Sequence, residues 1–129
     1  MNKLEKKSVI GISALLVHAA KIDEIYSDHE KELVKSFIKS YLGDDDINKT
    51  LKKAEEIENN SNQLLNFTNI IKQNPMHIKK DIVEHLWKVI ISDNTVDQYE
   101  SNLMRRICGL IYFPDKECAE IKLKLMNSK

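Results

Sequence analysis

The chain has few of the residues that interrupt helices. Its 129 residues include only three glycines and two prolines, and Leu, Ile, Lys, Glu and Asn are frequent. Leu, Lys and Glu favour helices, whereas folds built from many short strands need Gly-rich and Pro-rich turns. The composition therefore predicts an all-α fold in which long helices are separated by short breaks.

An excess of charge of either sign is also missing. Twenty basic and twenty acidic residues cancel, and they are mixed along the chain. Because nucleic-acid binding usually needs a clustered basic face, we expect no nucleic-acid partner. A length of 129 residues suffices for one domain with a real core, so we expect a single domain over residues 1–129.

Cysteine is scarce, and its spacing is wrong for zinc. Cys108 and Cys118 are ten residues apart, without a CxxC pair and without histidines at a matching interval. Cys108 lies in an apolar run, which predicts a small buried hydrophobic residue. This use of cysteine fits a reducing compartment, and we expect a cytoplasmic protein.

The first twenty residues have the outline of a secretory signal: lysines, an apolar run and then small residues. Two features favour a core helix instead. His18 interrupts the apolar run, and the segment has a counterpart later in the chain. The run is too short to span a membrane, so we expect no direct membrane insertion.

An internal repeat appears when the chain is compared with itself at an offset of 70 residues. Apolar character is also kept where identity is lost, for example between Val17 and Trp87 and between Phe37 and Ile107. This pattern predicts a duplicated helical unit in which Trp87 is a core residue. The identical pairs are Ile12 and Ile82, Leu16 and Leu86, Asp23 and Asp93, Glu30 and Glu100, and Leu33 and Leu103.

Each copy is predicted to contain three helices. Helical spacing of apolar residues, Gly43 and the two prolines set the expected ends. The result is a bundle of about seven helices, made of two pseudo-repeated three-helix units over about 8–60 and 76–127 and a linking helix over about 62–74. The expected helices of the units are 6–22, 28–42, 45–60, 76–91, 98–112 and 115–127.

Acidic residues recur where the second helix of each copy begins. Ser27 with Glu30, and Asp97 with Glu100, fit a capping box, which by itself explains the glutamates. It does not explain Asp23 and Asp93, which end the preceding helices, where an acidic side chain is unfavourable. A hard cation such as Ca²⁺ or Mg²⁺ prefers such carboxylate oxygens, although the spacing is not that of an EF-hand.

The segment "VIISDNTVDQYESNLMRRICGLIYF" is similar to the pattern of the tellurite-resistance protein B-like (TerB-like) family, and "LLVHAAKIDEIYSDHEKELVKSFIKSYL" repeats that pattern more faintly. The resemblance covers residues 8 to about 125. It implies an all-helical bacterial domain linked to tellurite and other stress, with a metal-binding acidic cluster. Where the family has a glycine after the aspartate, this chain has Asn94 in the second copy and Glu24 in the first.

The resemblance carries the acidic cluster over to Asp23, Glu30, Asp93 and Glu100, and Asp97 and Asp28 are neighbours that could join it. The expected ion is Ca²⁺, Mg²⁺ or Zn²⁺. His29 is the histidine that could add a nitrogen ligand for zinc. We predict a non-enzymatic, stress-associated binding module with a protein partner. The alternatives are a metal-independent interaction module like that of a DnaJ-type co-chaperone, and a metal-dependent hydrolase. The predicted metal ligands are Asp23, Glu30, Asp93, Asp97 and Glu100.

Overall fold

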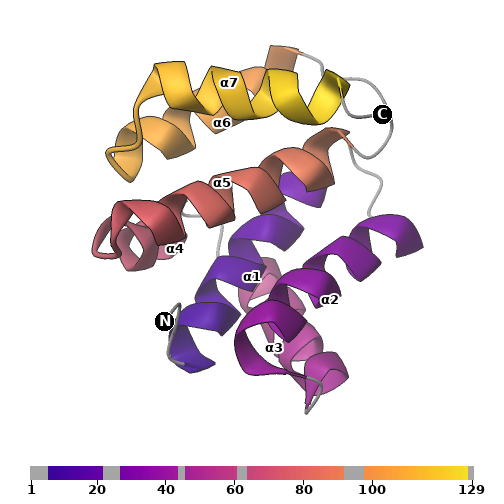
Figure 1. The fold of residues 1–129 in the computed structure, drawn as a ribbon. Coiled ribbons are helices and arrows are strands. Elements are labelled where there is room, and N and C mark those ends of the chain that lie inside the picture. Colours follow the sequence, from indigo (N-terminus) through magenta and orange to yellow (C-terminus); the bar gives the residue numbers. More distant parts are fainter. Residues whose placement is uncertain (1–5, 22–26, 44–45, 61–63, 92–97, 128–129) are drawn as a thin grey trace.

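The fold was analysed in a computed structural model, which describes residues 6–21, 27–43, 46–60, 64–91 and 98–127. These residues form seven α-helices and no strand, which confirms the predicted all-α bundle (Figure 1). The helices are α1 (Lys6–Ala20), α2 (Asp28–Leu42), α3 (Ile47–Asn60), α4 (Leu64–Lys72), α5 (Met76–Ile91), α6 (Gln98–Leu110) and α7 (Asp115–Asn127).

Local sequence signals account for most helix ends. The Gly43 backbone has φ 77°, and its N–H donates to the carbonyl oxygen of Lys39, as expected for a glycine that ends a helix. Helix α6 ends two residues before the predicted position 112. Tyr112 takes the left-handed conformation with φ 59°, and Phe113 N–H donates to the carbonyl oxygen of Cys108. A helix end of this kind usually has glycine at the left-handed position, so the sequence did not reveal that α6 ends here.

Helix α1 lies at the centre of the first half of the molecule. It packs against α2, α3, α4 and α5, and every residue from Val9 to Val17 is buried. A helix that is apolar on all sides is stable only when other helices surround it. The apolar run near the N-terminus is therefore core. In the part of the chain that the structure describes, no helix is long and apolar enough to cross a membrane.

The two predicted units recur in the same helix order. Helices α1, α2 and α3 pack against one another, and so do α5, α6 and α7. Adding the offset of 70 to the bounds of α1, 6 and 20, gives 76 and 90, which nearly matches α5 (Met76–Ile91). In Figure 1, α6 and α7 lie on one side of α5, and α1, α2 and α3 lie on the other. Trp87 on α5 is 3% exposed, which confirms its place in the core.

Candidate functional site

Glu30 is the one predicted metal ligand whose side chain the structure describes. It lies in the first turn of α2 and is 6% exposed. Its Oε1 accepts hydrogen bonds from the backbone N–H of Ser27 at 2.8 Å and from Ser27 Oγ at 3.1 Å. In return, Ser27 Oγ accepts from the Glu30 N–H at 3.2 Å. The capping box predicted at the start of α2 is therefore present.

The remaining predicted ligands lie outside what the structure describes. Asp23, Asp93 and Asp97 are outside the described residues, and Glu100 is on α6 with a side chain that is not described. Within the described ranges, no three His, Cys, Asp or Glu side chains lie close enough together to hold a metal ion. A carboxylate has about four lone-pair sites, so hydrogen bonds to one of its oxygens and a bound cation are compatible. An all-carboxylate set suits Ca²⁺ or Mg²⁺ better than zinc.

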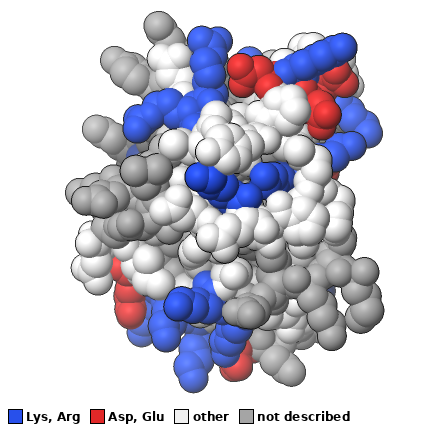
Figure 2. Space-filling view, turned by 90° about the vertical axis from the view of Figure 1, so that its left-hand side faces the viewer, with Lys and Arg blue, Asp and Glu red and all other residues white. Residues whose placement is uncertain are grey.

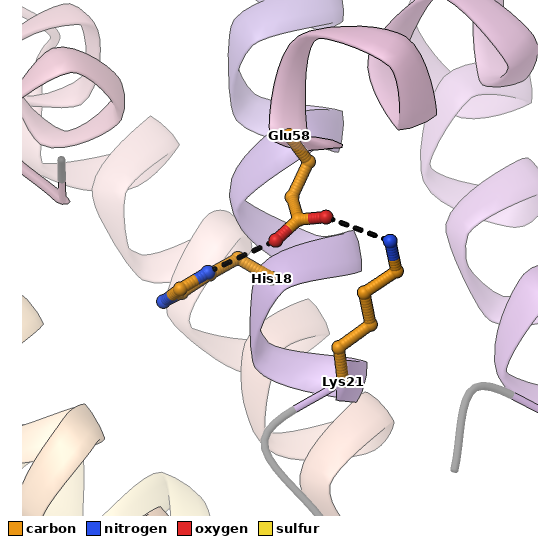
Figure 3. Close-up of polar contacts among 3 residues, drawn as sticks. All are labelled: His18, Lys21 and Glu58. Carbon is orange, nitrogen blue, oxygen red and sulfur yellow. Dashed lines mark hydrogen bonds and ion pairs between the residues drawn. The ribbon is translucent and has the colours of Figure 1, made fainter. Parts of the chain in front are cut away.

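A cluster of three ionisable residues joins α1 to α3 (Figure 3). Glu58 on α3 is 7% exposed. Its Oε1 accepts from Lys21 Nζ at 2.8 Å, and its Oε2 lies 3.2 Å from His18 Nδ1. Because a buried carboxylate is costly without partners, the two basic groups are what allow Glu58 to face the core. The cluster holds the end of α1 against α3.

Sequence reasoning missed this cluster, although one signal for it was present. On α3 the structure buries Leu51, Ala54 and Glu58 and leaves Ile57 half-buried. Glu58 follows Ala54 by four residues and therefore lies on the same face of the helix. A charged residue on a buried face needs a partner of opposite charge. Lys21 is that partner, and His18, the interruption in the apolar run of α1, is half-buried with its Nδ1 3.2 Å from the carboxylate.

A groove of about 750 Å³ lies where α1, α3 and α4 meet. Its uncharged lining consists of apolar side chains together with Thr50, whose buried Oγ1 has no hydrogen-bond partner among the described residues. Figure 2 shows the face that carries α4 and the first turn of α1, and Lys or Arg side chains gather along its lower part. The groove is lined by Lys6, Lys7, Ile10, Gly11, Lys49, Thr50, Lys53, Ile57, Phe67 and Ile70.

The described residues define a class of small all-helical domains built from two related three-helix units. Comparison with protein families places the chain within that class. The family model described as "Tellurite resistance protein TerB" matches residues 10–123, and the chain belongs to the TerB family. Neither a curated protein nor a solved structure matches the chain significantly.

Proposed function

We propose that this chain is a non-enzymatic, stress-associated binding module of the cytoplasm, in which acidic residues at the helix starts hold a divalent cation. Membership of the TerB family supports the general class. The observation that carries the metal proposal is Glu30, a buried carboxylate held at the start of α2. Glu100 recurs at the same place in the second unit.

The proposed ligands are Asp23 and Glu30 in the first unit and Asp93, Asp97 and Glu100 in the second. A cation held between the acid that follows α1 or α5 in the sequence and the acids near the start of α2 or α6 would offset the repulsion between these carboxylates. It would also fix the angle between the two helices of each pair, and so the shape of the surface offered to a partner protein. Ca²⁺ or Mg²⁺ suits these donors, and Zn²⁺ would need His29 as well.

A thermal-shift series tests the metal proposal. The wild type, Asp93→Asn and the control Asp115→Asn are each unfolded with Ca²⁺, Mg²⁺, Mn²⁺, Zn²⁺ or a chelator. Asp115 is an exposed acidic residue of α7. Specific binding raises the midpoint of the wild type and of the control by mass action, and raises that of Asp93→Asn less. Equal midpoints for the wild type in every cation and in chelator would contradict the proposal.

The lysine-lined groove favours a second candidate, a metal-independent protein-interaction module. Lys7, Lys49 and Lys53 have no ion pair within the described part of the chain, and Lys6 pairs only with the exposed Asp46 at 3.8 Å. Such a groove is complementary to an amphipathic helix with an apolar stripe and acidic flanks. The unpartnered hydroxyl of Thr50 offers a polar contact at the same place.

Selection from a display library of random helical peptides tests the second candidate. We expect the selected peptides to combine an apolar stripe with Asp or Glu. Their binding should be lost in Lys49→Glu/Lys53→Glu and kept in Lys52→Glu, since Lys52 is exposed on α3 but does not line the groove. Selected peptides that bind all three proteins equally would contradict this role for the groove. Asp93→Asn should leave peptide binding unchanged, which separates this candidate from the metal proposal.

A further inference from the structure

The two cysteines are brought together by the turn between α6 and α7. Cys108 Sγ donates a hydrogen bond to Cys118 Sγ over 3.0 Å, and the two residues are 0% and 6% exposed. Backbone hydrogen bonds hold the main chain at both cysteines. The carbonyl oxygen of Cys108 accepts from the Phe113 N–H at 2.8 Å, and Cys118 N–H donates to the carbonyl oxygen of Pro114 at 3.0 Å. A disulfide bond of about 2.05 Å would need the sulfur atoms to approach by only about 1 Å.

The two thiols differ in access. Cys118 lines a pocket of about 440 Å³ together with Trp87, Arg105 and Lys122, whereas Cys108 is not part of its lining. The ammonium of Lys122 lies 5.5 Å from the centre of the Trp87 ring. A solute the size of a peroxide that enters this pocket therefore meets the sulfur of Cys118 first.

The two thiols also differ in acidity, because their hydrogen bond has a direction. The bond from Cys108 lowers the pKa of Cys118, and the charge of Lys122 lowers it further, against the opposing effects of burial and of Asp115. The same bond raises the pKa of Cys108, as do its burial and Asp115. The thiolate, which is the nucleophilic form, therefore forms more readily at Cys118 than at Cys108.

We propose that Cys118 and Cys108 form an oxidation site for hydroperoxides, in which Cys118 reacts first and Cys108 closes an intramolecular disulfide. The Cys118 thiolate attacks one peroxide oxygen, the O–O bond breaks, and the other oxygen leaves as water or an alcohol after taking up a proton. Cys118 is then a sulfenic acid. The sulfur of Cys108 attacks the Cys118 sulfur, the S–O bond breaks, and hydroxide leaves with the Cys108 proton as water. The two sulfurs have then given two electrons to the peroxide.

This proposal is independent of the proposed binding function, since it uses neither the acidic residues nor the groove. Its product would be a reducible covalent link between α6 and α7. That link would close the short turn that contains Tyr112 and Pro114. The second unit would then respond to oxidants by becoming more rigid at one end.

The test oxidises the reduced full-length chain with increasing hydrogen peroxide. We expect the intact mass to fall by two hydrogen atoms and the number of alkylatable thiols to fall from two to none. Dithiothreitol should restore both. The disulfide should raise the unfolding midpoint by several degrees, as expected when a loop is closed. Dimedone added during the reaction should label Cys118, which peptide mapping of the wild type identifies without any variant.

Two variants separate the oxidation of Cys118 from the formation of the disulfide. Cys108→Ser should accumulate a dimedone-reactive sulfenic acid on Cys118, because its resolving thiol is missing. Cys118→Ser should lose thiol at least about tenfold more slowly than the wild type, since its remaining thiol is protonated and enclosed. The proposal is overturned if both thiols stay alkylatable at a peroxide concentration that oxidises free cysteine. It is also overturned if dimedone labels Cys108 in the wild type, or if the disulfide joins two chains.

Discussion

Tyr41 on α2 donates a 2.6 Å hydrogen bond to Asp81 Oδ2 on α5, which joins the two three-helix units through their side chains. Aromatic contacts surround this bond. The Phe37 ring lies 5.0 Å from that of Tyr41 and 5.1 Å from that of His85, in edge-on contact with the latter. His85 Nδ1 lies 2.9 Å from the backbone oxygen of Asp81, which can only accept, so Nδ1 carries the hydrogen. The contact between the units is therefore both polar and aromatic.

Replacing Tyr41 by phenylalanine should destabilise the protein. Tyr41→Phe keeps the ring that packs on Phe37 and removes the donor to Asp81, which should lower the free energy of unfolding by about 1–2 kcal/mol. Urea unfolding followed by circular dichroism measures this change. The control is Tyr112→Phe, at a side chain that is 65% exposed, and it should change stability by less than about 0.5 kcal/mol. Equal effects of the two substitutions would contradict the role of this bond.

The same bond predicts a dependence of stability on alkaline pH. Burial, the hydrogen bond to Asp81 and the Asp81 charge raise the pKa of Tyr41 well above its ordinary value of 10.0. Above pH 10 the unfolded chain releases the phenolic proton while the folded chain keeps it, so this contribution is complete below pH 10 and falls as the pH rises. The difference in unfolding free energy between wild type and Tyr41→Phe should therefore shrink from pH 9 to about pH 11. A constant difference would contradict the raised pKa.

The buried glutamate of α3 should contribute measurably to stability. Glu58→Gln keeps the shape of the side chain but removes the charge that pairs with Lys21 and His18, and should cost about 1–3 kcal/mol. Lys21 is about a third exposed and turns toward solvent in the variant, which keeps the loss below that of a fully buried pair. Chemical unfolding measures the loss. Glu56→Gln, at an exposed position of α3, should change stability by less than about 0.5 kcal/mol. A similar cost for both substitutions would show that the cluster adds nothing.

The cap of α2 can be separated from a metal site at the same place. Ser27→Ala removes the side chain that accepts from the Glu30 N–H and should cost about 1 kcal/mol. Ser27→Gly should cost only a few tenths of a kcal/mol, because glycine is a tolerated cap. Unfolding is measured with Ca²⁺ and with a chelator. If Ser27 acts only as a cap, the cost of Ser27→Ala is the same in both, and a cost that appears only with Ca²⁺ would contradict this.

Two glycines should respond in opposite ways to alanine. A Cβ at Gly11 on α1 would overlap with Ile70 Cδ1 on α4, whereas one at Gly109 on α6 would meet nothing within 4 Å. Gly109→Ala should stabilise the protein by about 0.5–1 kcal/mol through helix propensity. Gly11→Ala should not stabilise the protein in this way, because the contact with Ile70 offsets the gain in helix propensity.

A double-mutant cycle tests the contact at Gly11 directly. Ile70→Val removes the Cδ1 atom, so Gly11→Ala in that background should be more favourable by about 1 kcal/mol than in the wild type. Chemical unfolding of the four proteins gives the coupling energy. If Gly11→Ala and Gly109→Ala stabilise the wild type equally, α1 and α4 do not approach as closely as the structure indicates.

Most of the helical architecture could be predicted from the sequence, because helix formation is governed by neighbouring residues. The spacing of Leu33 and Phe37, the glycine at position 43 and the cap at Ser27 act within one or two turns. The end of α6 was missed by two residues, since its closing residue is Tyr112 rather than glycine. The predicted acidic cluster stays a prediction, with Glu30 placed at a helix start and the side chains of the other four residues outside the described part.

The helices, their order in two related units and membership of the TerB family follow from the order of amino acids alone, because they depend on local propensity and on recurring patterns. Which side chains meet across helices depends on the tertiary fold. Glu58 meets Lys21 across 37 positions, and Tyr41 meets Asp81 across 40. Cys108 and Cys118 are close in sequence, yet their contact depends on how α7 folds back over α6. Such contacts depend on packing angles between helices, which no periodicity within one helix encodes.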